Sequence, residues 1–349
     1  MKKSEIVMRP FLKRKVSLSL LFAVTIILLL IIYVQSKIIP PNQKVVFSNP
    51  EEKTGAHSPS YNAIELTNYK FVHPLLLAET TGQSEKLSDF KNFFNSYFIR
   101  KKSEGVINSA SALFMDLNDG EWTSVNGGES YNLGSLVKIP LLISSLKQYE
   151  TNPSFFEKAI FFDKIDSQIP VQTFGDEQIQ LGKIYTVNDL LFYMAAKSDN
   201  YSTHLLNAMM DAKVFKSVFT DLKLPAPDLH AKDYKLSVEE YTKFMRVLYA
   251  STYLNAKNSE YALTLLSQGA FKEGFLKQLP ANAIVSHKFG EFSMPEEKQL
   301  HESGIFYVNN HPYLLTVMTR GNDVRKLPEV LSDISKYIYD SITIGNKNI

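Results

Sequence analysis

Ser135-Leu136-Val137-Lys138 stands where a strand-like stretch passes into the apolar helical segment 139–146. Residues three apart on a helical turn share a face, so the Lys138 amine can lie beside the Ser135 hydroxyl and accept its proton. A lysine works as a base near neutral pH only when it is desolvated, and the apolar neighbours of this tetrapeptide could supply that environment. The tetrapeptide therefore predicts a serine nucleophile with a lysine base.

Two other motifs distinguish this tetrapeptide from chance repeats of the same spacing. Serine and lysine are also three apart at 88–91 and 144–147, where a solvated helix face is the expected role. The 135–138 tetrapeptide, at the passage from a strand-like stretch into a helix, is accompanied by a Ser-Asp-Asn triplet at 198–200, after a predicted helix, and by a Lys-Phe-Gly triplet at 288–290, in a predicted strand. The order of the three motifs makes 135–138 the candidate nucleophile site.

The pattern of hydrophobic residues around these motifs predicts an α+β fold. Ser237 and Glu240 have the spacing of a capping box, and Asp119-Gly120 suits a tight hairpin turn. The expected elements, in chain order, are an amphipathic helix at 87–98, a hairpin of 111–117 and 121–125, a largely helical region over 139–210, a helix from 237 to 248, strands at 283–289, 304–309 and 312–319, and a closing helix at 328–339. The terminal segments are thus expected to build one antiparallel sheet with flanking helices around an inserted helical subdomain.

The three motifs, in this order and on these elements, resemble the serine β-lactamases and penicillin-binding proteins. The resemblance is closest to the class A β-lactamase catalytic domain and spans about residues 86–342. It implies a β-lactamase/transpeptidase-like fold. It also implies a serine hydrolase that is acylated by β-lactams or by peptides of the D-alanyl-D-alanine type.

Carried over position by position, the resemblance implies four catalytic side chains. Ser135 would be acylated and Lys138 would activate it as a base. Ser198 would relay a proton to the leaving nitrogen, and Lys288 would hold Ser198 and attract an anionic substrate.

The resemblance also implies contacts to the substrate. The oxyanion hole would consist of the backbone N–H groups of Ser135 and Glu291. Asn200 would bind the amide side chain of the substrate, and Gly290 would leave room for its backbone. Phe289 stands where the family has a threonine or serine that helps bind the substrate carboxylate, so the identity of the ligand stays open.

A second departure from the family concerns deacylation. Class A enzymes use a glutamate on an Ω-loop between the second and third motifs, but residues 224–236 contain no glutamate. Asp228 and Asp233 are the only carboxylates of this stretch, and both are expected to be solvated. Without a positioned base, water attack on the acyl-enzyme is expected to be slow.

The N-terminal region predicts attachment to a membrane. Residues 16–34 are apolar with four exceptions and are long enough for one membrane-spanning helix, and six basic residues within the first fifteen favour a cytosolic N-terminus. A cleaved signal peptide is the alternative, but this segment does not end in small residues. The expected domains are a cytosolic basic tail (1–15), a transmembrane signal anchor (16–34), a proline-rich extracytoplasmic tether (35–85) and the catalytic domain (86–345) on the outer side of the cell membrane.

Composition excludes several other classes of protein. The chain has no cysteine, so it forms no disulfide and has no thiol nucleophile. Its net charge is +2, and no basic cluster outside the N-terminal tail suggests nucleic-acid binding. The seven histidines lack the spacing of metal ligands and no glycine-rich phosphate loop occurs, so neither a metal nor another cofactor is expected.

Two other functions remain open at this point. Phe289 makes a hydrolase of another small amide or ester credible. A catalytically slow penicillin-binding or sensing module, which reads cell-wall fragments at the membrane, is the second alternative. The complete set of catalytic residues in the three motifs favours an enzyme.

Overall fold

The computed structural model describes residues 61–345 apart from 68, 70–71, 176, 228–232 and 309–310. These residues belong to one compact unit of the chain. The predicted cytosolic tail and membrane anchor, like the first part of the predicted tether, lie outside the described residues. Within the described part, no helix has both the length and the apolar character needed to cross a membrane.

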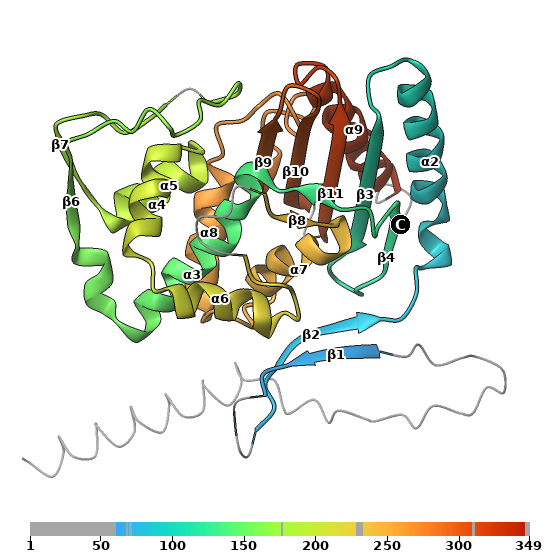
Figure 1. Ribbon diagram of the computed structural model, residues 1–349. Coiled ribbons are helices and arrows are strands. Elements are labelled where there is room, and N and C mark those ends of the chain that lie inside the picture. The colour runs from blue at the N-terminus through green and yellow to red at the C-terminus, as the bar shows by residue number, and fades with distance from the viewer. Residues whose placement is uncertain are drawn as a thin grey trace, which may run out of the picture. The chain divides into compact units, whose positions relative to one another are not determined.

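A five-stranded antiparallel sheet forms the centre of the described unit (Figure 1). Its β3 strand, from the N-terminal part of the chain, pairs with β11 near the C-terminus, with Ala112 opposite Val317. Both ends of the domain therefore meet in one sheet, as the sequence predicts. The strands in sheet order are β4 (Trp122–Val125), β3 (Ser109–Asp116), β11 (His311–Gly321), β10 (Lys298–Val308) and β9 (Ile284–Ser293).

Two terminal helices, α2 (Ser88–Ser103) and α9 (Leu327–Gly345), pack together against one side of the sheet (Figure 1). Phe94 and Phe98, four residues apart on α2, are buried in the same apolar cluster as Leu331 of α9 and Val317 of β11. Residues four apart lie on one face of a helix, so the aromatic repeat that predicts this helix also supplies its buried face. Burial of one such phenylalanine stabilises the fold by roughly 1.5–3 kcal/mol.

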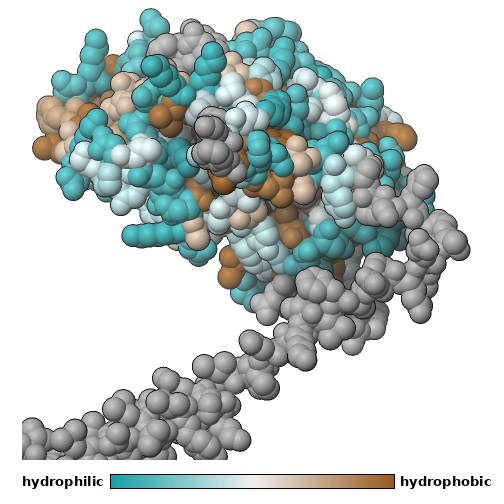
Figure 2. Space-filling model, turned by 90° about the horizontal axis from the view of Figure 1, so that it is seen from below, coloured by the Kyte–Doolittle hydropathy of each residue, from teal (hydrophilic) through white to brown (hydrophobic). Residues whose placement is uncertain are grey.

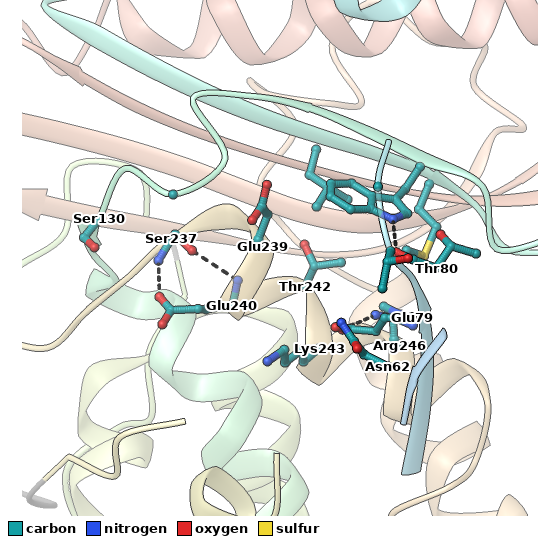
Figure 3. A pocket seen from close by; sticks show the side chains of 16 residues that line it. Asn62, Glu79, Thr80, Ser130, Ser237, Glu239, Glu240, Thr242, Lys243 and Arg246 are labelled. Atoms are coloured by element: carbon teal, nitrogen blue, oxygen red, sulfur yellow. Dashed lines mark hydrogen bonds and ion pairs between the residues drawn. The ribbon is translucent and has the colours of Figure 1, made fainter. Parts of the chain in front are cut away.

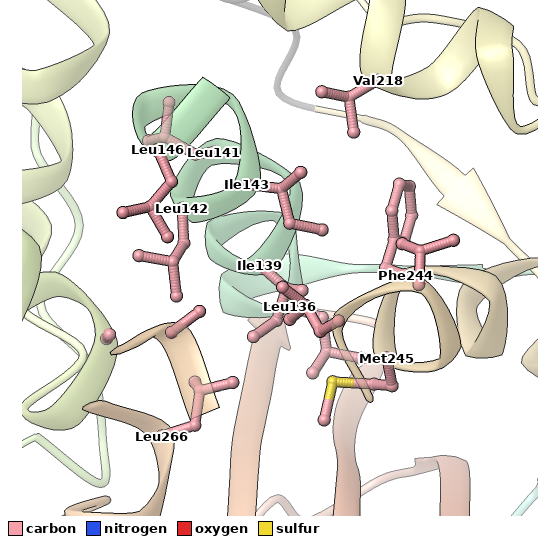
Figure 4. Packing of buried hydrophobic residues seen from close by; sticks show 14 of the residues in the cluster. Leu136, Ile139, Leu141, Leu142, Ile143, Leu146, Val218, Phe244, Met245 and Leu266 are labelled. Carbon is pink, nitrogen blue, oxygen red and sulfur yellow. The ribbon is translucent and has the colours of Figure 1, made fainter. Parts of the chain in front are cut away.

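A mainly helical region lies between β4 and β9, with α7 in contact with β3, β10 and β11. Its central helix, α3 (Lys138–Thr151), is buried all round in its first part, because apolar residues occupy every face there. Figure 4 shows this helix packed among Val218, Phe244, Met245 and Leu266. The other helices are α4 (Val187–Ala196), α5 (Asn200–Met209), α6 (Ala212–Asp221), α7 (Val238–Tyr249) and α8 (Ala256–Ser267), with 3₁₀ turns η1 (Glu85–Leu87), η2 (Gly134–Val137) and η3 (Pro153–Glu157).

The helix starts agree with the sequence analysis. The Ser237 hydroxyl accepts the N–H of Glu240 at 3.2 Å, and the Glu240 carboxylate accepts the N–H of Ser237 at 2.9 Å, which is the predicted capping box. The prediction of an α+β fold with an antiparallel sheet and flanking helices is confirmed. The region expected to be helical over 139–210, however, contains the hairpin β6 (Ala159–Phe162) and β7 (Lys183–Thr186). Both strands are short and their partners lie far apart in sequence, so local periodicity does not reveal them.

A second difference concerns the predicted tether. Strands β1 (Tyr61–Glu65) and β2 (Leu75–Thr80) form an antiparallel pair within it. Outside the tether, β5 (Tyr131–Asn132) forms a second short pair with β8 (Lys235–Leu236). The Arg246 side chain on α7 donates to Glu79 of β2 at 2.7 Å. Proline content predicts an irregular segment here, but burial of the apolar β2 side chains and this ion pair hold the hairpin on the domain.

Candidate active site

The surface itself gives little indication of function. The face shown in Figure 2 mixes hydrophilic and hydrophobic residues, and the exposed large apolar side chains include Ile99, Phe161 and Val171 from different segments. Scattered apolar side chains are ordinary on protein surfaces. The cavities of the described residues are more informative.

One cavity of about 530 Å³ brings the sequence motifs together. Its wall includes Ser135 and Lys138 of the first motif, Asn200 of the second, and Glu291 directly after the third. These residues come from the consecutive elements η2 and α3 and from α5 and β9, which lie far from them in the chain. The tertiary structure therefore places the predicted site residues in or directly behind one pocket.

Two glycines allow the nucleophile turn to lie against β9. Gly134, directly before Ser135, has a φ of +51°, and a Cβ there would collide with the carbonyl oxygen of Glu291. A Cβ on Gly290 would collide with the carbonyl oxygen of Leu133. Only glycine avoids both contacts and tolerates the left-handed backbone. The two backbone segments predicted to form the oxyanion hole, at Ser135 and Glu291, are thereby brought close together.

Lys138 is buried and points at the second motif. Its Nζ donates to Asn200 Oδ1 at 2.7 Å, to Ser198 Oγ at 3.2 Å and to the Ser198 carbonyl oxygen. Burial lowers the pKa of Lys138 to about 7, against a smaller opposing effect of Asp199. The three donated bonds belong to the charged form; in the neutral form, which burial favours, Nζ keeps two N–H groups and a lone pair that can accept a proton.

Ser198 joins the two lysines of the site. Lys288 Nζ donates to Ser198 Oγ at 2.8 Å, on the same hydroxyl that Lys138 approaches. Burial, and then the charge of Lys138, hold the pKa of Lys288 well below its usual range. Ser198 has a left-handed φ of 59°, which costs a residue other than glycine about 1–3 kcal/mol. The arrangement gives a hydroxyl that can pass a proton between two amines.

Gln172 is a site residue that the sequence analysis missed. Its Nε2 donates to Ser135 Oγ at 2.6 Å and to Asn200 Oδ1 at 3.0 Å. No hydrogen bond links Ser135 Oγ to Lys138 Nζ among the described residues, since the amine is directed at Ser198 and Asn200. Gln172 lies in an irregular segment between β6 and β7, where no motif or periodicity could have indicated it.

Phe289 is expected from its place in the third motif to line the substrate site, but it lies outside the pocket wall. Its ring is buried, stacks on Phe271 with ring centroids 4.4 Å apart, and is not part of the pocket wall. Lys288 Nζ lies 4.2 Å from the centre of the same ring, which favours the charged amine by a cation–π interaction. The ring therefore acts behind the site, on Lys288, and does not line the substrate pocket.

Carboxylates are scarce in the pocket. Glu291 is the only one in its wall among the described residues, and its two oxygens accept the N–H of Thr173 at 2.9 Å and the hydroxyl of Thr173 at 2.6 Å. Asp233 is mostly exposed and accepts a hydrogen bond from Asn132 at 2.7 Å, while Asp228 lies outside the described residues. The described part of the chain has no group of three or more residues suited to hold a metal ion.

A second cavity, of about 490 Å³, lies between the β1–β2 hairpin, α7 and the β3–β4 hairpin (Figure 3). The Glu79–Arg246 ion pair lies in its wall, and the capping box of Ser237 and Glu240 lies at another part of it (Figure 3). None of the predicted catalytic residues lines this cavity. The chemistry of the chain is therefore concentrated in the pocket around Ser135.

The convergence of the three motifs agrees with a comparison of the sequence with protein families. The model of the β-lactamase enzyme family matches residues 91–342. The chain belongs to this family. It is accordingly a serine hydrolase of the β-lactamase type. No curated protein sequence matches this family member closely enough to count as a relative.

Solved structures show the same fold. A β-lactamase from Chitinophaga pinensis is 16% identical, with a TM-score of 0.63 over 73% of this chain and 99% of that one. An ancestral class A β-lactamase is 14% identical, with a TM-score of 0.61 over 72% and 99%. A mutant of PBP-A, solved as an acyl-enzyme with penicillin G, is 16% identical, with a TM-score of 0.59 over 72% and 97%. At these identities the likeness establishes the fold of this β-lactamase family member.

Replacing Phe289 tests its position behind the site. Phe289→Thr is expected to lower the free energy of unfolding by about 3–5 kcal/mol, because it removes a buried ring from its stack on Phe271. Urea denaturation measures the change. Phe161→Thr is the matched control, since that ring is 56% exposed and its loss should change stability by less than about 0.5 kcal/mol. Unchanged stability together with faster acylation by penicillin would place the ring in the pocket wall.

Proposed function

We propose that this protein is a membrane-anchored, extracytoplasmic serine hydrolase that is acylated at Ser135 by β-lactams or by D-alanyl-D-alanine-type peptides. One observation carries the proposal: a buried lysine with a pKa of about 7 lies in the wall of the same pocket as a serine and within hydrogen-bond distance of the second motif. Such a lysine is suited to activate a hydroxyl nucleophile near neutral pH.

The proposed reaction begins with proton transfer from Ser135 to neutral Lys138, which requires the amine to turn from Asn200 and Ser198 towards the Ser135 hydroxyl. Ser135 Oγ then attacks the carbonyl carbon of the substrate, and the backbone N–H groups of Ser135 and Glu291 stabilise the negative oxygen. Ser198 passes the proton on to the leaving nitrogen as the bond between carbon and nitrogen breaks. The 3.2 Å contact between Lys138 Nζ and Ser198 Oγ supports this route, and Lys288 holds Ser198 from the other side.

The proposed substrates follow from family membership and from the charges at the site. PBP-A, a protein with the same fold, forms an acyl-enzyme with penicillin G. In this chain Lys288 lies behind Ser198, where its charged form would attract an anionic group. Asn200 lies in the pocket wall, in position to bind the amide side chain of such a substrate. Gly290 lets β9 lie directly against the nucleophile turn, because a Cβ there would meet the carbonyl oxygen of Leu133.

Slow release of the acyl group favours a second candidate, a penicillin-binding or sensing module with little turnover. The only carboxylate in the described pocket wall, Glu291, is held through both oxygens by Thr173. A general base contributes roughly 10²–10⁴-fold to such a step. Without a free base, the acyl-enzyme would persist, and the protein would trap β-lactams more readily than it destroys them.

Covalent labelling tests the proposed nucleophile. Intact-protein mass spectrometry after exposure to penicillin G should show one persistent adduct, because Lys138 assists acylation while the described pocket wall holds no free carboxylate to assist deacylation. Ser135→Ala should abolish the adduct. Ser88→Ala and Ser144→Ala, which alter the two other serines at the same spacing, should leave it intact. An adduct on the Ser135→Ala protein would refute the assignment.

The pKa of Lys138 predicts how acylation depends on pH. The base must be neutral, so the acylation rate should rise with pH through about 7 and level off above it. Below that value the neutral fraction falls about tenfold per pH unit. Stopped-flow measurement of penicillin acylation between about pH 5.5 and 8.5 would show this profile. A flat profile over the range would mean that another group activates Ser135.

The proposed location rests on the sequence of residues 16–34 and on the basic residues before them. Protease added to intact cells should digest the catalytic domain, because the proposed topology exposes it outside the membrane. Carbonate washing of undigested membranes should leave the protein in the membrane fraction. Release of a shortened soluble form would show that the segment is a cleaved signal peptide.

A further inference from the structure

The segment of residues 168–175, here called the strap, is tied to all three parts of the site. Gln172 Nε2 donates to Ser135 Oγ at 2.6 Å. Asn200 Nδ2 donates to the carbonyl oxygen of Pro170 at 2.7 Å. At the end of β9, the Glu291 carboxylate accepts two hydrogen bonds from Thr173. The strap is therefore connected to the nucleophile turn, to the second motif and to the strand of the third motif.

An aromatic stack supports the end of the strap. The ring of Phe174 meets that of Phe271 edge-on, with centroids 5.4 Å apart, and Phe271 stacks on Phe289 at 4.4 Å. Phe289 is the residue that departs from the usual third motif. The phenyl ring that replaces the hydroxyl of the usual motif therefore supports the strap, because it packs on Phe271 and Phe271 packs on Phe174.

The position of Gln172 hinders attack by Ser135. Ser135 Oγ accepts a 2.6 Å hydrogen bond from Gln172, which occupies one of the two lone pairs of the hydroxyl oxygen and makes it less nucleophilic. The Gln172 side chain also forms part of the pocket wall. Its amide is held by a second acceptor, Asn200 Oδ1, which is the group expected to meet the substrate. A substrate must therefore displace Gln172 from both partners.

We propose that Gln172 determines access to the nucleophile: the strap holds its amide on Ser135, and acylation requires this contact to break. The inference rests on the proposed function, since it concerns acylation of Ser135. The strap favours ligands whose own polar groups replace Gln172 at Asn200, and it slows acylation by ligands that lack them. The hydrogen bonds between Thr173 and Glu291 keep the strap closed in the absence of ligand.

Gln172→Met tests the proposal, because methionine has a similar length but no N–H to donate. The rate constant for acylation by penicillin G, measured by mass spectrometry, should rise about three- to tenfold, as expected for the loss of one hydrogen bond that restrains the nucleophile. Gln178→Met is the matched control, since Gln178 is exposed and lies outside the pocket wall. A rate that is unchanged or lower in Gln172→Met, with wild type labelled normally, would overturn the proposal.

A second measurement separates this inference from the proposed function. Hydrogen–deuterium exchange needs no substrate, and in Gln172→Met the amides of residues 168–175 should exchange at least about threefold faster than in wild type, because both hydrogen bonds of the Gln172 side chain are lost. Gln178→Met should leave that exchange unchanged. Equal exchange in all three proteins would overturn the inference. Absence of any penicillin adduct on wild type would instead contradict the proposed function.

Discussion

The close contact between the η2 turn and strand β9 is the constraint on which the site depends. Gly134 and Gly290 face backbone atoms of the opposite segment at distances that no side chain would tolerate. The contact fixes the Ser135 N–H and the backbone of Glu291 on one side of the pocket. It also fixes the start of α3, and therefore the position of Lys138, because the turn continues directly into that helix. Preorganisation of this kind comes from the backbone and is independent of the substrate.

Burial of two lysines around one serine gives the site its chemistry. Lys138 and Lys288 both donate to Ser198 Oγ, and desolvation lowers the pKa of each. Two positive charges at this separation would repel, so loss of one proton relieves the repulsion. The apolar packing around α3 is what excludes water from Lys138. The hydrophobic core and the reactivity of the site are thus connected through one helix.

The aromatic residues behind the site connect Lys288 of the third motif with the strap. Phe289 contacts both Lys288 and Phe271, and Phe271 contacts Phe174 of the strap. A hydroxyl at position 289 would make neither the stack on Phe271 nor the cation–π contact with Lys288, because both need an aromatic ring. Phe289, in place of the usual threonine or serine, therefore changes the packing behind the site. The residues of the proposed proton transfer, Ser135, Lys138 and Ser198, are all present. This combination fits the proposed acylation of Ser135 and the proposed control of access by Gln172.

Several features of the protein were determined by the sequence alone. The three motifs, the β3–β4 hairpin and the capping box at Ser237 and Glu240 depend on residues close together in the chain, and each was predicted correctly as a local structure. The order of the motifs along the chain was also sufficient to indicate the family. Local patterns carry this information because turn geometry, capping and helical periodicity act over a few residues.

Other features were decided only by the tertiary structure. Gln172 is held by Asn200, 28 positions away in the chain, and Phe289 packs on Phe271, 18 positions away. The same holds for the β1–β2 hairpin, which is held on the domain by Arg246 of α7. No local pattern encodes a partner so distant in sequence. These positions follow from packing and from the need of buried or partly buried polar groups to find hydrogen-bond partners, which only the folded chain can satisfy.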